Sequence, residues 1–300
     1  MILTADLHLR RNPPRARTDD YTTAQERKLR FILKQAQTSQ PLLVAGDFFH
    51  QSRPGEGMLR WVIDLLREYK VKPICVPGQH DLPGHSLEQI GESGLGVLAA
   101  AGVIQLLCND FLYDDDHRLS LFGQAFGSFD FDIKFLRSDT NTKILLWHHM
   151  VINNELWPGQ EADKATAILR KYKQFNLIIT GDNHQSFMVS PSSDLDGKEK
   201  LLINPGSMMR MTATQVDHKP CVFKWEQGKL EQIFLPIEEN VLDLTELEQT
   251  KERDGRISAF VERLNTQHEI GLDFQKNLEI HLQTNEIKEN VKKIIWECVE

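Results

Sequence analysis

The chain has 300 residues, of which 40% are hydrophobic and 26% are charged, and its formal net charge is −8. This composition is ordinary for a globular protein, and the length allows one large domain plus a small one. The negative charge argues against a protein that coats nucleic acid, but it does not exclude local contact with nucleic acid. No apolar stretch approaches the roughly 18 residues that span a bilayer, so we expect no membrane segment. With no visible signal peptide and four scattered cysteines, we expect a cytoplasmic protein.

Five short apolar runs, most of them rich in Ile, Leu or Val, are expected to form strands that are covered on both faces. They lie at residues 2–5, 42–45, 74–76, 144–147 and 177–180. Helical patterns are expected between them at residues 23–37, 58–69 and 86–101. Thr23 with Glu26 resembles a capping box, and Ser86 with Gln89 resembles another. Alternating strands and helices predict an α/β layered core.

The pattern changes after Gly206. Two apolar runs at residues 221–225 and 230–235 flank a Glu-Gln-Gly-Lys turn, which predicts a hairpin. Beyond it, helical patterns at 257–264 and 287–295 surround a strand-like run at 278–282. We therefore expect a main domain over residues 1–237 and a small α+β domain over residues 238–300.

Residues that can bind metal ions follow each of the five apolar runs. In chain order they are Asp6 and His8, Asp47, Gln79 with His80 and Asp81, His148 with His149, and Asp182 with His184. The carboxyl ends of strands in an open α/β sheet share one edge, where ligands bind. One such motif alone is commonly a plain turn, but five in order at strand ends predict a metal site. Oxygen and imidazole ligands without thiolates suit Mn²⁺, Fe²⁺ or Mg²⁺, with Zn²⁺ as a further alternative.

The order Asp-x-His, Gly-Asp, Gly-x-His-Asp, His-His and Gly-x-x-His over residues 1–237 resembles the calcineurin-like metallophosphoesterases. Within that superfamily, Gly-Asp-Phe-Phe-His at residues 46–50 and Asn-Pro-Gly-Ser at 204–207 resemble motifs of the DNA double-strand-break repair nucleases. The most similar group is the SbcD-type nuclease subunit with its phage recombination-endonuclease relatives. The predicted small domain stands where those enzymes carry a capping domain.

The resemblance implies two divalent metal ions, with Mn²⁺ expected and Mg²⁺ or Fe²⁺ as alternatives. Asp6, His8 and His184 would hold the first ion, and Asp47 would bridge both. Gln79, His148 and Asp182 would hold the second ion. Two of these residues depart from the family pattern, because Gln79 replaces Asn and Asp182 replaces His. Both changes favour harder ions at the second site.

The resemblance also implies catalytic roles. His80 would orient the phosphate and protonate the leaving oxygen, and Asp81 would fix the tautomer of His80. His50 is either a second catalytic histidine or an ordinary loop residue. His149 is expected to pack or to form hydrogen bonds rather than to bind metal.

The expected substrate is DNA, cut as an exonuclease or endonuclease in repair or recombination. Arginines near the motifs are candidate DNA contacts, although the first four also fit a solvated loop balanced by Asp19 and Asp20. They are Arg10, Arg11, Arg15, Arg17, Arg53 and Arg210. Two alternatives stay open: a phosphatase or small-molecule phosphodiesterase of the same superfamily, and a non-catalytic interaction module. As partners, the family implies an SMC-type coiled-coil ATPase subunit (SbcC-like) and a second copy of the chain.

Overall fold

The computed structural model describes residues 1–39, 41–114, 118–128, 142–154, 162–190, 200–226, 228–245, 247, 249, 256, 274–285 and 287–298. The chain divides into two compact units, Met1–Asp243 and Leu244–Glu300. The sequence predicts a boundary after residue 237, and the boundary in the structure lies slightly further along the chain, after Asp243.

The first unit contains two six-stranded sheets. In spatial order the first sheet has β14 (Lys229–Phe234), β13 (Cys221–Glu226), β1 (Ile2–Thr4), β2 (Leu42–Ala45), β3 (Ile74–Val76) and β4 (Gln105–Leu106). Strands β1 to β4 are parallel, with Leu3 opposite Leu43 and Val44 opposite Cys75. The expected hairpin is confirmed, because β13 and β14 pair antiparallel and β13 pairs with β1.

The second sheet has β11 (Phe187–Val189), β12 (Leu201–Asn204), β10 (Leu177–Gly181), β7 (Thr142–His148), β6 (Leu119–Gln124) and β5 (Asp110–Asp114). Its four central strands are parallel, whereas the edge strands β11 and β5 are antiparallel to their neighbours. A two-stranded ribbon of β8 (Val151–Ile152) and β9 (Asp163–Lys164) completes the described strands. All five strands expected from the apolar runs are present.

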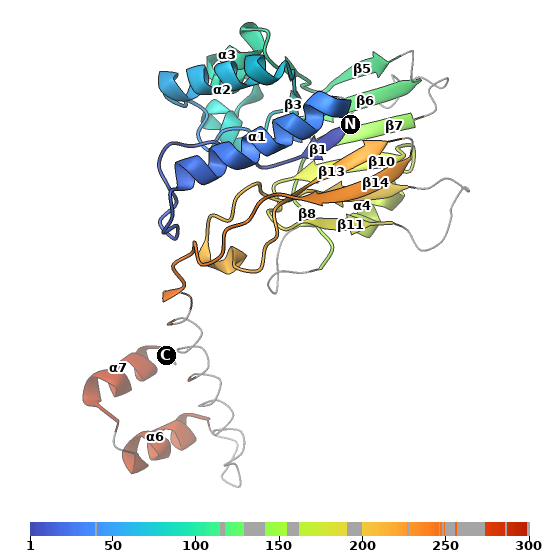
Figure 1. Ribbon diagram of the computed structural model, residues 1–300. Helices are drawn as coiled ribbons and strands as arrows, with labels where there is room; N and C mark the ends of the chain where they lie inside the picture. The colour runs from blue at the N-terminus through green and yellow to red at the C-terminus, as the bar shows by residue number, and fades with distance from the viewer. Residues whose placement is uncertain are drawn as a thin grey trace. The chain divides into compact units, whose positions relative to one another are not determined.

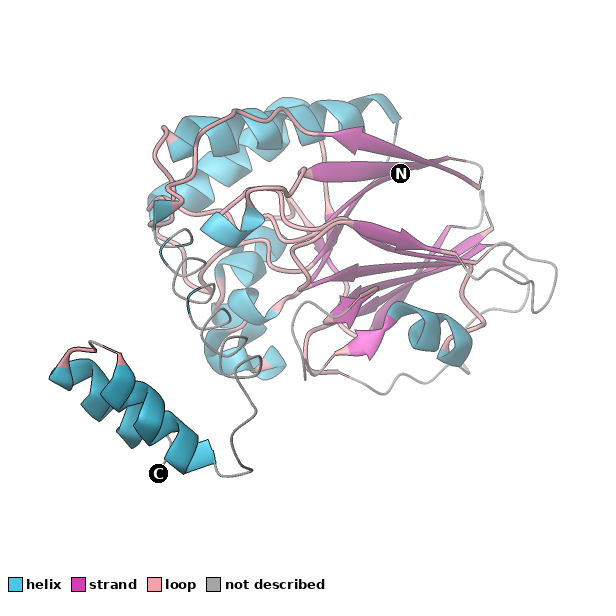
Figure 2. Cartoon of the chain, turned by 90° about the horizontal axis from the view of Figure 1, so that it is seen from below, coloured by secondary structure: helices cyan, strands magenta, loops and turns pink. Residues whose placement is uncertain are grey.

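The two sheets pack face to face between helices, as Figures 1 and 2 show. Successive side chains of a strand point to opposite faces. Ile2 and Val44 therefore belong to the core between the first sheet and its helices, which are α1 (Tyr21–Ser39), α2 (Glu56–Tyr69) and α3 (Gly94–Ala100). Leu3 and Leu43 point the other way and lie in the core between the two sheets. The outer face of the second sheet packs on α4 (Ala165–Lys171). This four-layer arrangement confirms the expected α/β layered fold.

Two helix starts differ from the expectation. Helix α1 begins at Tyr21, and Asp20 rather than Thr23 caps it, because Asp20 accepts hydrogen bonds from the backbone N–H (3.1 Å) and hydroxyl (2.7 Å) of Thr23. The helix expected from Ser86 is divided into the 3₁₀ helix η3 (Leu87–Glu92) and α3. Ser93 caps α3 by accepting the Gly96 N–H. Further 3₁₀ turns are η1 (Gln79–Asp81), η2 (Pro83–His85) and η5 (Ala213–Gln215).

The second unit contains α6 (Phe274–Thr284) and α7 (Glu289–Glu297). The strand expected at residues 278–282 is wrong, since these residues lie in α6. Leu278 and Leu282 are buried one helical turn apart, a spacing of four residues that fits both a helix and a strand over so short a run. The helix expected at 257–264 falls outside the described residues. Of the helices that the structure describes, none has the length and apolarity to cross a membrane.

Candidate metal centre

The expected ligands gather where five parallel strands end. Backbone hydrogen bonds join the loops after β1 and β2, from Asp6 N to Gly46 O (3.1 Å) and from His8 N to Asp47 O (2.9 Å). Four expected ligands have left-handed backbones, with φ of 48° at Asp6, 43° at His8, 49° at Asp47 and 78° at Asp182. Such angles are uncommon outside glycine and concentrate at functional sites, where the surrounding structure stabilises them.

One group of donors matches the first expected metal. Asp6, His8 and His184 each offer a ligand atom, and the three atoms lie within 4.8 Å of one another. The Nε2 atoms of His8 and His184 are 3.1 Å apart. The Oδ2 atom of Asp47 lies 3.6 Å from His8 Nε2. Donors that share one ion at about 2.1 Å each are separated by roughly 3–3.5 Å, so these spacings fit a common ion.

A second group contains Asp6, Asp47 and His148, again with ligand atoms within 4.8 Å of one another. The Nε2 atom of His148 lies 3.6 Å from Asp47 Oδ2. Because His148 Nδ1 donates to the carbonyl of Ala45 at 2.8 Å, Nε2 carries the lone pair. Both Asp47 Oδ2 and His148 Nε2 are buried and have no hydrogen-bond partner. Unpaired buried polar atoms are costly, and a divalent cation between them would satisfy both.

The other two expected ligands of the second ion contact each other. Gln79 Nε2 donates to Asp182 Oδ1 at 3.0 Å. The backbone N–H of Asp182 points to the carboxylate of Asp6, at 3.1 and 3.2 Å from its two oxygens. Asp182 does not belong to the metal-spaced groups above, and its contacts with Gln79 and with the Asp6 carboxylate place it beside them.

Burial makes the centre electrostatically unfavourable without a cation. Burial and the neighbouring Asp47 raise the pKa of Asp6 well above its ordinary value. Burial also raises the pKa of Asp47 to about 7. Burial lowers the pKa of His184 to about 4, so its imidazole is neutral and can donate a lone pair. Divalent cations stabilise carboxylates and neutral imidazoles together, which is the combination present here.

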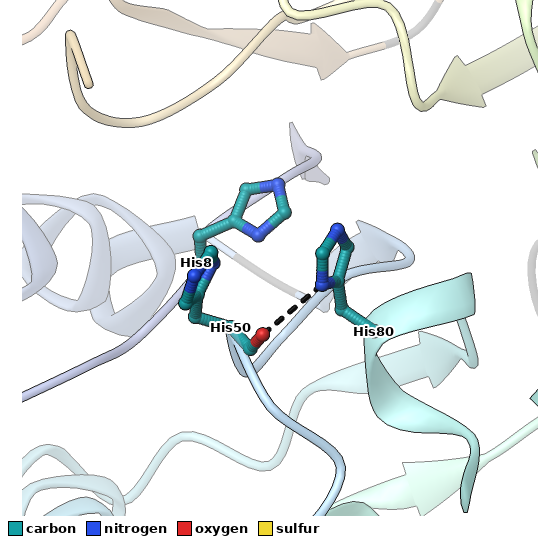
Figure 3. A group of neighbouring side chains, drawn as sticks. All are labelled: His8, His50 and His80. Atoms are coloured by element: carbon teal, nitrogen blue, oxygen red, sulfur yellow. Dashed lines mark hydrogen bonds between the residues drawn. The ribbon is translucent and has the colours of Figure 1, made fainter. Parts of the chain in front are cut away.

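Three histidines form a cluster beside the metal donors (Figure 3). The rings of His50 and His80 stack with centroids 5.3 Å apart. His80 Nδ1 donates to the backbone carbonyl of His50 at 3.0 Å, which leaves His80 Nε2 free for other chemistry. The ring of His8 meets that of His80 edge-on at 4.9 Å. The backbone N–H of His80 donates to Asp47 Oδ1 at 2.9 Å, so one carboxylate contacts both the metal donors and the His80 segment.

The model of the calcineurin-like phosphoesterase family matches residues 1–186. The chain belongs to this family. Membership confirms the superfamily expected from the sequence and makes the protein a metal-dependent phosphoesterase. None of the curated proteins compared with the chain matches it.

Several solved structures are similar to this phosphoesterase. A dimetal phosphatase from Danio rerio has a TM-score of 0.52 at 11% identity, over 79% of this chain and 96% of that one. TT1561 of Thermus thermophilus has a TM-score of 0.48 at 13% identity, over 78% and 98%. A 5′-nucleotidase precursor from the same organism has a TM-score of 0.46 at 12% identity, over 86% and 58%. At these identities the likeness to the dimetal phosphatase concerns the fold alone.

The role expected for Asp81 in this phosphoesterase is wrong. Its buried carboxylate accepts backbone N–H groups of Phe48 (3.1 Å), Phe49 (2.9 Å) and Gly78 (3.0 Å). The tautomer of His80 is fixed instead by the carbonyl of His50. Asp81 therefore connects the loop after β2 with the loop after β3 through hydrogen bonds to their backbone N–H groups. It supports the centre by holding these two loops together.

His50 and Arg10 form a pair at the edge of the histidine cluster. Arg10 Nη1 lies 2.9 Å from His50 Nε2, and because a guanidinium can only donate, His50 accepts. Burial lowers the pKa of His50 to about 4, and the Arg10 charge adds to that shift. Buried Gln25 holds the Arg10 backbone through two hydrogen bonds of 3.0 Å. His50 is therefore a partner of His80 and Arg10 rather than an isolated loop residue.

His149 bonds Asp163 Oδ2 at 2.7 Å and stacks on Trp147 with centroids 4.1 Å apart. It packs and forms a hydrogen bond, as expected.

Two of the six arginines proposed for DNA contact are structural, so that expectation is wrong for them. Arg17 is buried, pairs with both carboxylate oxygens of Asp19 at 2.6 and 2.7 Å and donates to the carbonyl of Arg210. Arg210 is also buried and donates to the carbonyls of Val216 and Glu238. Neither guanidinium is available to a phosphate backbone.

The remaining four arginines are partly or fully exposed. Arg10 and Arg11 line a pocket of about 280 Å³ together with His50. Arg11 donates to the carbonyl of Gly57 at 2.8 Å, and Arg53 pairs with Glu92 at 2.5 Å on the surface. Arg15 also has an interaction, so it is not a free cation.

Asn204 holds the loop that carries His184 through side-chain hydrogen bonds. Its side-chain amide donates to the carbonyls of Asn183 (2.5 Å) and Gln185 (2.7 Å), the two neighbours of His184. The residues after it continue this support, since Ser207 N donates to His184 O and Met208 N donates to Asp6 O, each at 3.1 Å. In the sequence, the Asn-Pro-Gly-Ser turn at residues 204–207 is the signal that indicates this segment.

Proposed function

We propose that this phosphoesterase hydrolyses phosphodiester bonds of DNA with two divalent ions, Mn²⁺ being the expected metal. The observation that carries a two-ion site is the position of Asp47 Oδ2, which is 3.6 Å from both His8 Nε2 and His148 Nε2. A carboxylate oxygen at this distance from one imidazole of each donor group could serve both ions.

Each residue of the centre has a role in the proposed reaction. One ion would be held by Asp6, His8 and His184. The other ion would be held by Gln79, His148 and Asp182, and Asp47 would bind both ions. When bound, such ions activate water at neutral pH and neutralise charge on phosphate oxygens. His80 donates its Nδ1–H to the His50 carbonyl, so Nε2 of the doubly protonated ring is the atom that would give a proton to the leaving oxygen.

Two observations support a polynucleotide substrate. The pocket lined by Arg10, Arg11 and His50 adjoins the histidine cluster, and its cations suit a phosphate backbone. The motifs at residues 46–50 and 204–207 resemble those of DNA repair nucleases. His50, Asn204 and Ser207 in those motifs all contact the segments that carry the metal donors or His80.

A second candidate function is a phosphatase or small-molecule phosphodiesterase. The dimetal phosphatase of similar fold favours it, as does the net charge of −8. Three of the arginines expected to contact DNA also favour this candidate, because they are not available to a phosphate backbone. Arg17 and Arg210 are buried, and Arg53 is paired with Glu92. This candidate needs the same ions and the same His80 chemistry, so only the substrate separates the two.

The test is hydrolysis by the native protein with Mn²⁺ of four substrates: p-nitrophenyl phosphate, bis-p-nitrophenyl phosphate, linear DNA and circular DNA. The Asp47→Asn variant serves as the control for contaminating enzymes. We expect cleavage of DNA and of the diester, with the monoester much slower. Rapid monoester hydrolysis without DNA cleavage would replace the proposed substrate by the second candidate. No hydrolysis of any substrate would favour a non-catalytic role.

A further inference from the structure

The two residues that depart from the family pattern touch each other. Gln79 follows β3 of the first sheet and Asp182 follows β10 of the second, 103 positions later in the chain. Gln79 Nε2 nevertheless donates to Asp182 Oδ1 at 3.0 Å. The two departures are therefore one structural feature rather than two separate substitutions.

This hydrogen bond depends on both departures. The amide N–H₂ needs an acceptor at position 182, and a carboxylate is an acceptor only. A neutral histidine that binds a metal through one ring nitrogen has only an N–H on the other nitrogen, so it offers the amide no acceptor. The methylene that Gln79 adds over asparagine extends its amide toward the loop after β10. Changing either residue alone should therefore leave the other without its partner.

The bond leaves two oxygens of the pair for a cation. Gln79 uses its nitrogen toward Asp182, so its Oε1 keeps both lone pairs, and Asp182 keeps Oδ2. Asp182 also contacts the second donor group directly, because its backbone N–H lies 3.1 and 3.2 Å from the two carboxylate oxygens of Asp6.

We propose that Gln79 and Asp182 act as a hydrogen-bonded unit that gives the second ion two oxygen donors and makes that site select Mg²⁺ and Mn²⁺ over Zn²⁺. Oxygen donors suit hard cations, whereas an imidazole in place of the carboxylate favours Zn²⁺ or Fe²⁺. This inference rests on the two-ion centre of the proposed function, but it does not depend on the substrate.

The test is a double-substitution cycle followed by metal binding rather than by activity. The proteins are the native chain, Gln79→Asn, Asp182→His and the combination of both. Each is titrated with Mn²⁺, Mg²⁺ and Zn²⁺ by calorimetry, and electron paramagnetic resonance detects the coupling between two neighbouring Mn²⁺ ions. His149→Gln is the matched control, since His149 adjoins a ligand in sequence but bonds Asp163. Thermal unfolding establishes that every variant is folded.

We expect each single variant to weaken Mn²⁺ at the second site by about 10–100-fold, the usual effect of losing a residue that orients a ligand. The loss of Mn²⁺ affinity in the double variant should be smaller than the product of the two single losses. The affinity of its second site should also shift in favour of Zn²⁺ relative to Mn²⁺. His149→Gln should match the native protein. Independent, multiplicative effects would overturn the coupling, and an unchanged Mn²⁺ to Zn²⁺ preference in the double variant would overturn the selectivity. Native-like coupling in a protein that cleaves no DNA would refute the proposed substrate alone.

Discussion

The imidazole rings of His50 and His80 stack nearly parallel, at 5.3 Å between centroids and 18° between planes. Their connection is twofold, because the backbone carbonyl of His50 also accepts the Nδ1 proton of His80 at 3.0 Å. The ring of His50 thus sets the position of His80, whereas its backbone sets the tautomer. These two contributions are separable by mutation, since a side-chain substitution keeps the carbonyl.

His80→Ala should retain metal binding and lose about 10²–10⁴-fold in rate, which is the usual contribution of general acid catalysis. The loss should be smaller for p-nitrophenyl esters, because a good leaving group needs little protonation. Steady-state rates with a p-nitrophenyl diester and with an alkyl diester measure the difference. An equal loss on both substrates would mean that His80 only positions the phosphate.

His50→Ala should be milder than His80→Ala, because the carbonyl that fixes the His80 tautomer remains. The ratio of rates on good and poor leaving groups should stay close to the native ratio. The Michaelis constant should rise, because the Arg10 guanidinium loses the His50 ring that positions it. Measuring both parameters on the two diesters tests this. If His50→Ala reproduces the leaving-group pattern of His80→Ala, then His50 itself transfers a proton.

Asp47→Asn should abolish hydrolysis and leave the fold intact, because the carboxylate serves the metal centre and not the apolar core. In the native protein Mn²⁺ should raise the thermal unfolding temperature, since a ligand that binds only the folded state stabilises it by RT ln(1 + [L]/Kd). The variant should lose most of that increase. Unfolding curves with Mn²⁺ and with a chelator measure it. A variant that keeps near-native activity would mean that the site is misassigned.

The sequence predicted the strands and the donors better than it predicted their contacts. Apolar runs and the residues after them are local features, so the five strand ends and the five donors of the metal-spaced groups could be found by reading along the chain. The partners of Asp81 and Arg17 could not, because they depend on which loops meet in three dimensions. The strand expected at 278–282 failed for another reason, since two leucines one helical turn apart fit both periods over so short a run.

Asn204→Asp should weaken the first metal site specifically. The variant keeps the size of the side chain but cannot donate to the carbonyls on either side of His184, so the loop that carries this ligand should lose its fixed position. We expect about 10–100-fold weaker Mn²⁺ binding, as for other residues that orient a ligand. Calorimetric titration measures the affinity.

The control is Asn109→Asp, an exposed asparagine whose side chain holds Ala125 and Ser128 away from the metal donors. It should bind Mn²⁺ as the native protein does. Asn204→Gln restores the donor on a longer side chain and should recover part of the affinity. If Asn204→Asp lowers thermal stability but leaves the Mn²⁺ affinity unchanged, then Asn204 is purely structural.

Lys28 should make the stability of the first unit depend on pH. Its ammonium is buried and contacts the carbonyl of Met208 at 3.3 Å, and burial lowers its pKa from 10.5 to about 7, with the Arg17 and Arg210 charges adding to the shift. The unfolded chain binds this proton up to about pH 10.5, whereas the folded chain releases it near pH 7, so this residue makes stability rise with pH between these values. The slope is at most about 1.4 kcal/mol per pH unit. The test is urea unfolding of the native protein and of Lys28→Met at pH 7, 8 and 9. The difference in unfolding free energy should move in favour of the native chain as pH rises. A difference that stays constant would show that Lys28 remains charged in the folded protein.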